Sequence, residues 1–383
     1  MSSPDTHSNQ QSKRLVWDLP TRVFHWSFVL CFVTAWITHE NDRFLYEHVY
    51  VGYVFFGLLL FRFVWGWVGS HYARFRSFAY DWPSVAAYLR GLLNGEAMRH
   101  IGHNPAGGWA IFAMLLLGLL VSITGLLVFG GEEGHGPLSG LVSYELGNMA
   151  KELHEVLALT MLLLVFVHIV GVVVESYYHR ENLIWAMIHG HKLGSQDGAK
   201  VRMYALIAVV MLGVIVVSAA YYFRGYVTQT DTKPFIPFTS PALPSNAIWE
   251  AECGECHLAF HPTLLPARSW RRMMEQQAEH FGDDLAYDEE TISEITEFLV
   301  TNAAESGLTE AAHKIKRSVP AGETPLGITA TQYWKRKHEE INEKYWKASS
   351  VKSKANCTAC HLDAKSGWFE DSNMRLPKLI KEK

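Results

Sequence analysis

The chain has 383 residues, enough for two or three domains, and 34 Lys and Arg residues stand against 38 Asp and Glu residues, for a formal net charge of −4. A balance this close to neutral lacks the basic excess that nucleic-acid binding requires, so we expect no nucleic-acid partner. The charged residues crowd into the C-terminal third, which means that the near-zero mean hydropathy averages two unlike halves.

Long apolar stretches before residue 224 predict a bundle of transmembrane helices. With flanking residues, each reaches the roughly 18 to 20 residues that cross a bilayer. The five expected spans are 23–38, 49–68, 109–129, 156–174 and 204–223. We therefore expect an all-α fold with a membrane domain at 1–223, a Pro/Thr-rich linker at 224–246 and a mainly α-helical domain at 247–383. Four prolines, Pro234, Pro237, Pro241 and Pro244, make the linker an extended, stiff spacer.

The loops predict the orientation, because Lys and Arg accumulate on the cytoplasmic side of short connections. Basic residues precede the first span and fill the loops after the second and fourth spans, whereas acidic residues such as Asp42 and Glu132 mark the other two loops. We expect a cytoplasmic N-terminus and a periplasmic C-terminal domain at a bacterial inner membrane. The polar leader 1–12 runs into a full-length span without a small-residue cleavage site, so the first helix is expected to remain as an anchor.

Two copies of one five-residue pattern lie in the C-terminal third, Cys253-Gly-Glu-Cys256-His257 and Cys357-Thr-Ala-Cys360-His361. The pattern is typical of c-type haem attachment, in which two thiols bond to the haem vinyl groups and the histidine ligates the iron. A zinc ribbon is the alternative, but its cysteine pairs are usually separated by about 15 to 20 residues, whereas about a hundred intervene here. A redox-active disulfide would need a strand-helix-strand context that the sequence lacks. We expect two covalent haem c groups, attached outside the cytoplasmic membrane.

Histidines inside membrane spans are costly and usually functional, and four of them are related by geometry. His154 and His168 lie fourteen residues apart on the fourth span, which places them within about 40° of one face and about 21 Å apart along the axis. His25 and His168 lie toward the cytoplasmic ends of their spans, whereas His48 and His154 begin theirs at the periplasmic surface. The predicted pairs, His25 with His168 and His48 with His154, would each hold a non-covalent haem b. An interfacial or capping role is the alternative for each histidine taken singly.

The segment Val16–Trp26 resembles the opening of the bacterial cytochrome b-561 family, which includes the b-type subunit of nickel-iron hydrogenases. Further sequence motifs similar to those of the family occur at Phe61–Gly66, His103-Asn104-Pro105 and Glu152-Leu153-His154-Glu155, so the resemblance covers about residues 14–195. It implies two haems held by the four histidines above. A second resemblance, to diheme cytochrome c domains, covers about residues 248–376. It rests on the two attachment motifs, Leu264–Trp270 and His280–Asp283.

A haem c that only carries electrons needs a sixth ligand, and several histidines compete for the two positions. His280 precedes the amphipathic stretch 290–302, a place where small c-type cytochromes commonly bring in the distal ligand, so we assign it to the first haem. His338 is assigned to the second haem. His261 is the alternative, because it follows His257 by four residues on what we expect to be the same helix and would face the other haem.

Two charged features also predict a role. Arg62 lies near the cytoplasmic end of the second span, where it would pair with a haem propionate; snorkelling to the interface is the alternative. Acidic residues outnumber Lys and Arg by 14 to 3 over residues 246–310, while basic residues lead by 15 to 8 from residue 311 to the end. Two lobes of opposite sign would steer a charged redox partner. Alternatively, the lobes complement each other or lipid headgroups.

These features together predict a membrane-anchored tetrahaem b/c cytochrome that carries electrons between the quinone pool and a periplasmic redox partner. In the preferred direction a quinol is oxidised, and electrons pass through the b haems to the c haems and on to a soluble cytochrome or reductase. The reverse alternative takes electrons from a periplasmic dehydrogenase such as a hydrogenase and delivers them to quinone. A haem-based sensor with an open iron position is a further alternative, and a catalytic reductase would need another active-site motif, which the sequence lacks. No residue pattern locates the quinone site.

Overall fold

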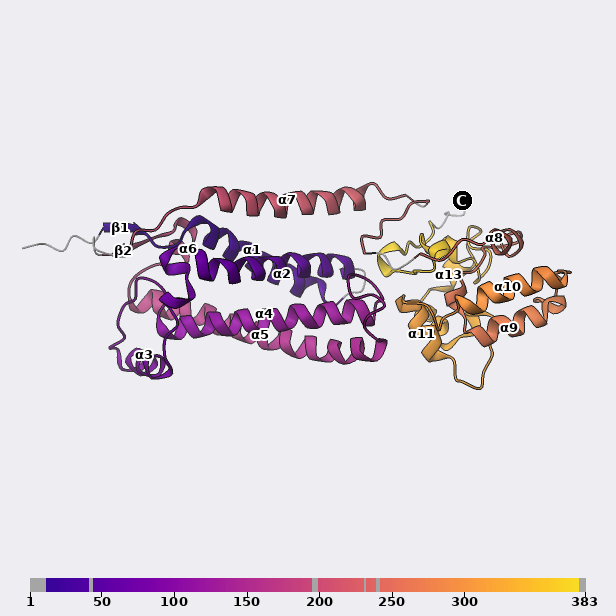
Figure 1. The fold of residues 1–383 in the computed structure, drawn as a ribbon, viewed down its shortest axis with the longest axis horizontal. Coiled ribbons are helices and arrows are strands. Elements are labelled where there is room, and N and C mark those ends of the chain that lie inside the picture. Colours follow the sequence, from indigo (N-terminus) through magenta and orange to yellow (C-terminus); the bar gives the residue numbers. More distant parts are fainter. Residues whose placement is uncertain (1–11, 41–43, 195–198, 231, 239–241, 379–383) are drawn as a thin grey trace, which may run out of the picture. The chain divides into compact units, whose positions relative to one another are not determined.

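The computed structural model describes residues 12–40, 44–194, 199–230, 232–238 and 242–378. Residues 1–11 of the predicted leader lie outside these ranges. So do Asp42, in the loop after the first predicted span, and Pro241 of the predicted linker. Within them the chain is almost entirely helical (Figure 1), which confirms the predicted fold class. One small sheet was not predicted. Its strands β1 (Ser12–Leu15) and β2 (His191–Gly194) pair antiparallel with four residues each, too short and too far apart in sequence for periodicity to indicate them.

Four helices in the described part of the chain are long and apolar enough to cross a membrane: α2 (Leu45–Val68), α4 (Pro105–Gly131), α5 (Tyr144–Tyr178) and α7 (Ala205–Val227). The first of the five predicted spans forms helix α1 (Leu19–Thr38), which is 20 residues long. Its mean hydropathy falls short of the other four because Arg22, His25 and several hydroxyl side chains interrupt the apolar run. By composition, the prediction of five spans is therefore corrected to four.

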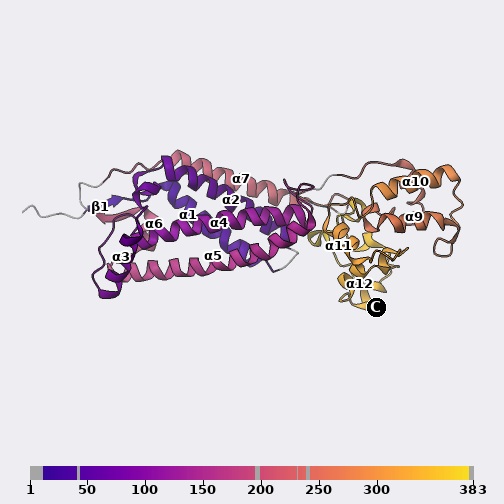
Figure 2. The same ribbon diagram turned by 60° about the horizontal axis from the view of Figure 1, so that its bottom comes forward.

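Helices α1, α2, α4 and α5 run alongside one another in both views (Figures 1 and 2). Their shared core contains Phe24 and Cys31 of α1, Leu59 of α2, Leu115 of α4 and Met161 of α5. Helix α7 packs against the same core and is joined to α2 by a 2.9 Å hydrogen bond between Tyr50 and Ser218.

Helix α5 is longer than the membrane requires. Its 35 residues span about 52 Å at 1.5 Å per residue, against a hydrocarbon core of about 30 Å. The predicted span 156–174 leaves twelve residues of α5 before it and four after it, so mainly the N-terminal end of α5 extends beyond the hydrocarbon. Helix α3 (Trp82–Asn94) belongs to the connection between α2 and α4, and α6 (Leu183–His189) follows α5.

The chain forms two compact units. The first comprises residues 1–40, 47–125 and 152–221, and the second comprises residues 41–46, 126–151 and 222–383. The second unit thus contains the end of α4 and the start of α5 together with the whole C-terminal part. The second unit therefore includes the predicted linker, 224–246, and two earlier segments of the chain as well as the predicted C-terminal domain.

The C-terminal part is built from short helices around a small core. They are α8 (Ala247–Glu252), α9 (Ala267–Glu275), α10 (Glu289–Thr301), α11 (Glu310–Ser318), α12 (Gln332–His338) and α13 (Glu343–Trp346). Helices α9 and α10 lie side by side in both views (Figures 1 and 2) and bury Trp270, Ile295 and Leu299. The predicted amphipathic helix at 290–302 is α10.

Candidate haem-binding sites

In the first unit, helices α2 and α5 bring the rings of His48 and His154 close together. Their ring centroids lie 6.2 Å apart at an interplanar angle of 73°. Nδ1 of His48 lies 3.0 Å from the carbonyl oxygen of Ala35, and Nδ1 of His154 lies 3.0 Å from that of Val121. Metal-bound histidines usually donate their second ring N–H in this way. Both Nε2 atoms therefore remain for a ligand between the rings.

The separation of the rings tests whether an iron ion fits. A metal–nitrogen bond to imidazole is about 2 Å long and the ring centre lies about 1 Å further back, so two imidazoles across one metal ion have centroids about 6 Å apart. Three histidine pairs meet this requirement: His48 with His154 at 6.2 Å, His257 with His280 at 6.2 Å and His338 with His361 at 6.1 Å. Each pair fits a haem iron with two axial histidines.

The other predicted membrane pair, His25 and His168, comes from α1 and α5. The two side chains are close enough to interact electrostatically. Nδ1 of His25 is buried and has no hydrogen-bond partner among the described residues. The rings therefore share one region, toward the end of α5 opposite His154.

Arg62 of α2 is enclosed rather than extended to the surface, with 4% of its surface exposed. Its guanidinium lies 5.0 Å from the centre of the Phe75 ring and 5.8 Å from that of Phe78. One terminal nitrogen is buried and, within the described residues, has no hydrogen-bond partner. A buried guanidinium with unused donors fits a haem propionate, because guanidinium forms strong paired hydrogen bonds to carboxylates. Snorkelling would place the guanidinium at the membrane surface, whereas the Arg62 side chain is buried.

His103 belongs to the same region, although its position just before α4 suggested no role in the sequence. Its ring lies 4.6 Å from Trp17 and 4.5 Å from Phe78, centroid to centroid. Its Nδ1 is buried with no partner among the residues described, and Arg62 is within electrostatic range. In the sequence, the one indication of a role for His103 was that the His103-Asn104-Pro105 segment resembles the cytochrome b-561 family.

The first Cys-x-x-Cys-His motif follows helix α8 directly. Asn246 caps that helix by accepting the Trp249 N–H at 2.7 Å, and the helix ends at Glu252. Burial, assisted by the charge of Glu252, raises the pKa of the Cys253 thiol to about 11. His257 is exposed, with Nδ1 2.7 Å from the Leu258 carbonyl oxygen.

His280, the predicted distal ligand of the first haem c, is held opposite His257 by a tight turn. Its N–H donates to the Asp283 carbonyl at 2.8 Å, and the Asp283 N–H donates back at 3.1 Å. The turn passes through Phe281 and Gly282, which both have positive φ. The chain therefore reverses just beyond His280 and presents its ring toward the motif.

His261 does not share a helix with His257, and that expectation was wrong. Residues 253–261 contain no helix, because α8 ends before the motif and Pro262 begins a new 3₁₀ turn. His261 instead caps this turn, since its Nδ1 accepts the Thr263 N–H at 3.4 Å and also lies 2.8 Å from Thr263 Oγ1. Its ring packs so closely on Gly367 that a Cβ there would lie 2.2 Å from His261 Cγ.

The second motif lines a pocket of about 1020 Å³, counted with its open mouth. His338, Cys357, Cys360 and His361 all contribute to its wall. Nδ1 of His338 lies 2.8 Å from the Trp334 carbonyl oxygen. Burial raises the pKa of Cys357 to about 11 and lowers that of His361 to about 4. The pocket thus offers two thiols and two imidazoles, the donor set of a covalently attached haem with two axial histidines.

The zinc-ribbon alternative does not fit this arrangement. Across the described ranges, no three His, Cys, Asp or Glu side chains converge to hold a metal ion, so the two motifs do not combine into a ribbon site.

The second unit also contains a buried polar link that the sequence did not indicate. His135, which follows α4, is hydrogen-bonded through Nε2 to Glu370, nine residues after His361. Its ring lies 6.0 Å from that of Trp368 and 5.8 Å from that of Phe129. The segment after α4 is thereby fastened to the stretch that follows the second motif.

Comparisons with known proteins agree with the two parts of the chain. Residues 16–190 match the model of the prokaryotic cytochrome b561 family, and residues 249–369 match that of the dihaem cytochrome c family. A probable Ni/Fe-hydrogenase B-type cytochrome subunit of Azotobacter vinelandii is 27% identical over 223 residues, which are 49% of this chain and 92% of the relative. Its counterpart in Rhodobacter capsulatus is 25% identical, over 48% of this chain and 82% of the relative. The solved structure of a diheme cytochrome c from Rhodobacter sphaeroides is 35% identical over 34% of this chain and 100% of its own, with a TM-score of 0.30.

The two regions define a membrane electron-transfer protein that binds haem. Residues 16–190 are similar to the prokaryotic cytochrome b561 family, and residues 249–369 are similar to the dihaem cytochrome c family. Both predicted resemblances are confirmed.

Proposed function

We propose that the chain carries electrons between the quinone pool and a periplasmic redox partner, through two haem b and two haem c groups. The observation that carries this proposal is the set of three histidine pairs with centroids 6.1 to 6.2 Å apart. A pair of imidazoles on one iron occupies both axial positions, which suits electron transfer rather than binding of a substrate or gas. Each haem, when bound, supplies a one-electron couple.

The protein's part is to hold and tune these groups. We assign His25 and His168 to the cytoplasmic-side haem b, His48 and His154 to the periplasmic-side one, and Arg62 to a propionate. Nδ1 bonds to backbone carbonyls hold the His48 and His154 imidazoles in place. The enclosing apolar side chains exclude water, and such burial sets the reduction potential.

In the periplasmic domain we assign Cys253, Cys256 and His257 to the first haem c and Cys357, Cys360 and His361 to the second. His280 and His338 serve as the distal ligands. The environment of His261, buried against Gly367 and bonded to Thr263, favours His338 over it as the distal ligand of the second haem.

The direction that we prefer is from quinol to the periplasm. The relatives named as hydrogenase subunits match about half of this chain, which continues into the dihaem region. That continuation favours a relay to a soluble acceptor. Their names equally support the second candidate, in which a periplasmic dehydrogenase such as a hydrogenase feeds electrons to quinone.

Proteoliposomes that contain the purified protein test this proposal. With a quinol analogue in the membrane and a soluble c-type cytochrome outside, the acceptor should be reduced, and the double variant Cys357→Ala/Cys360→Ala should abolish the reaction. Acceptor reduction that is unchanged in this variant would contradict the relay. Carbon monoxide binding by a large fraction of the reduced haem would favour the sensor alternative.

A further inference from the structure

A buried carboxylate on α5 takes no part in holding haem. Glu175 lies seven residues beyond His168 and is 8% exposed. Seven residues place it within about 20° of the same helix face and about 10.5 Å further along the axis. It lies one residue beyond the predicted span 156–174, and a buried acidic side chain at the end of a membrane helix is a candidate for a proton or ion pathway.

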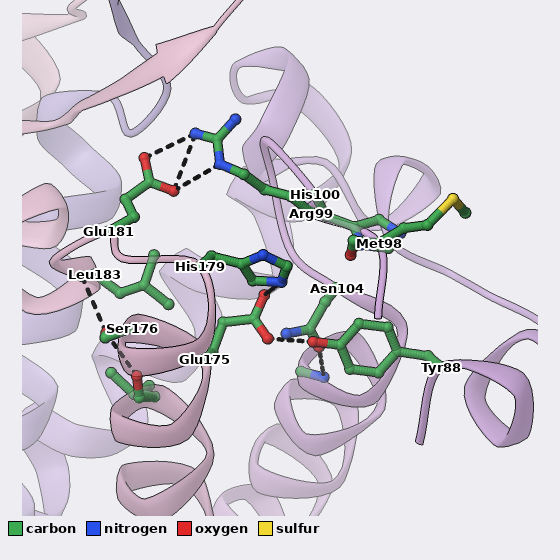
Figure 3. A network of polar contacts seen from close by, with 12 residues as sticks. Tyr88, Met98, Arg99, His100, Asn104, Glu175, Ser176, His179, Glu181 and Leu183 are labelled. Atoms are coloured by element: carbon green, nitrogen blue, oxygen red, sulfur yellow. Dashed lines mark hydrogen bonds and ion pairs between the residues drawn. The ribbon is translucent and has the colours of Figure 1, made fainter. Parts of the chain in front are cut away.

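Each oxygen of the Glu175 carboxylate lies close to one polar side chain (Figure 3). The Tyr88 hydroxyl, from α3, donates to Oε2 of Glu175. Nε2 of His179 lies 3.5 Å from Oε1, one helical turn further along the chain. Burial and the bond to Glu175 raise the pKa of Tyr88, so Tyr88 keeps its proton and remains a fixed donor. Of these two side chains, the imidazole of His179 is the type that commonly serves as a proton shuttle.

The two basic side chains nearest to this group pair with Glu181 rather than with Glu175. Arg99 forms two-pronged hydrogen bonds to Glu181, at 2.9 to 3.2 Å, and Lys192 lies 3.5 Å from the same carboxylate. In the described part of the chain, no Lys or Arg lies within ion-pair distance of Glu175. The titratable and charged groups nearest to it are Tyr88 on α3, Arg99 and His100 before α4, Tyr178, His179 and Glu181 at the end of α5, and Lys192 on β2.

His179 connects Glu175 with the outside of the unit. Its buried Nε2 faces Glu175 and has no hydrogen-bond partner among the residues described, while the side chain as a whole is 11% exposed. The next residue, Arg180, is exposed. A proton on Glu175 therefore has one titratable neighbour between itself and the surface at this end of α5.

We propose that Glu175 is a proton-exchange residue, with His179 as its outlet and Tyr88 as a fixed hydrogen-bond donor, for quinone chemistry next to the His25–His168 site. The inference rests on the proposed function and adds the proton route to it. Oxidation of one quinol releases two electrons and two protons. As each electron leaves for a haem iron, the Glu175 carboxylate accepts one proton and passes it through His179 to water before the next arrives. Quinone reduction uses the same steps in reverse.

The test compares Glu175→Gln with the wild type as complete, haem-loaded proteins. Glutamine keeps an acceptor for the Tyr88 hydroxyl but removes the titratable group. We expect unchanged haem content and at least tenfold slower reduction of the b band by a quinol analogue, while reduction by dithionite is unaffected. Glu175→Asp should restore part of the rate. Glu145→Gln, an exposed acid at the other end of α5, should behave as the wild type.

A second readout does not depend on quinol. Proton uptake that accompanies reduction of the nearby haem makes its midpoint potential fall as pH rises, and this slope should flatten in Glu175→Gln. A wild-type rate and slope in this variant would overturn the proposal. If quinol reduces neither protein, the proposed function fails, and the slope alone decides the role of Glu175: equal slopes in both proteins overturn it.

Discussion

We expect individual histidines to determine which haems the chain holds. The spacing of fourteen residues between His154 and His168 was sufficient to predict two ligands on one face of one helix, because helical geometry is regular. The partner His48 could also be predicted, since the direction of each span sets its depth. His103, Arg62 and Glu175 required the structure, because their enclosure depends on side chains from other segments.

Replacing His154 by Ala should remove one haem b and leave the other. His48 would lose its opposite imidazole, while His25 and His168 would remain. Haem extraction and the pyridine haemochrome spectrum should show a fall from two haem b to one per two haem c. His39→Ala, which changes an exposed histidine at the end of α1, should keep all four haems. Retention of both haem b groups in His154→Ala would contradict the assignment.

Replacing Arg62 by Gln should lower the midpoint potential of one haem b. A buried positive charge stabilises the added electron, and a charged hydrogen bond is worth about 1.5–3 kcal/mol, or about 60–130 mV for a one-electron couple. Spectroelectrochemical titration would measure the shift. Arg62→Lys should keep most of the potential, and an unshifted potential in Arg62→Gln would exclude a propionate contact.

At the scale of elements, the helices were largely predictable and their long-range contacts were not. Long apolar runs predicted α2, α4, α5 and α7, but not that α5 continues for 35 residues. Its first turns leave the apolar pattern and are stabilised within the second unit, where Lys151 pairs with Glu132 at 3.2 Å. The hydrogen bond between His135 and Glu370 joins residues 235 positions apart, a distance at which no local pattern indicates a contact.

Replacing His135 by Ala should weaken the second unit. Glu370 is 5% exposed, and a buried carboxylate left without its partner costs about 3–5 kcal/mol. We expect faster hydrogen exchange in residues 126–151 and around Glu370, together with a lower midpoint of urea unfolding followed through the haem c band. His135→Gln, which retains an N–H donor, should lose less. Equal unfolding midpoints for His135→Ala and the wild type would contradict a structural role for this bond.

For the whole molecule, the charge distribution indicates where the proposed soluble partner would meet the chain. In the described residues, none of the acidic side chains between 250 and 305 forms an ion pair with Lys, Arg or His, whereas Lys314 and Lys337 of the basic lobe pair with Glu310. Part of the basic lobe is thus neutralised within the second unit. The acidic lobe, which holds the first motif, remains available to a basic redox protein.

Electron transfer to a basic soluble cytochrome should therefore slow as ionic strength rises. Screening over about 8 Å at physiological ionic strength weakens attraction between surface charges. Stopped-flow measurement of the bimolecular rate at several salt concentrations should show a decline, smaller in the double variant Asp283→Asn/Asp284→Asn. A rate that ignores ionic strength would count against docking at the acidic lobe.

The central claim is that one chain conducts electrons from quinol through haem b to haem c. Rapid mixing of the purified, detergent-solubilised protein with a reduced quinol analogue, with the b and c absorption bands followed separately, tests it most directly. We predict that the b band is reduced first and the c bands follow. Reduction of neither band by quinol, when dithionite reduces all the haem, would contradict quinol oxidation by this chain and favour flow from a periplasmic dehydrogenase to quinone.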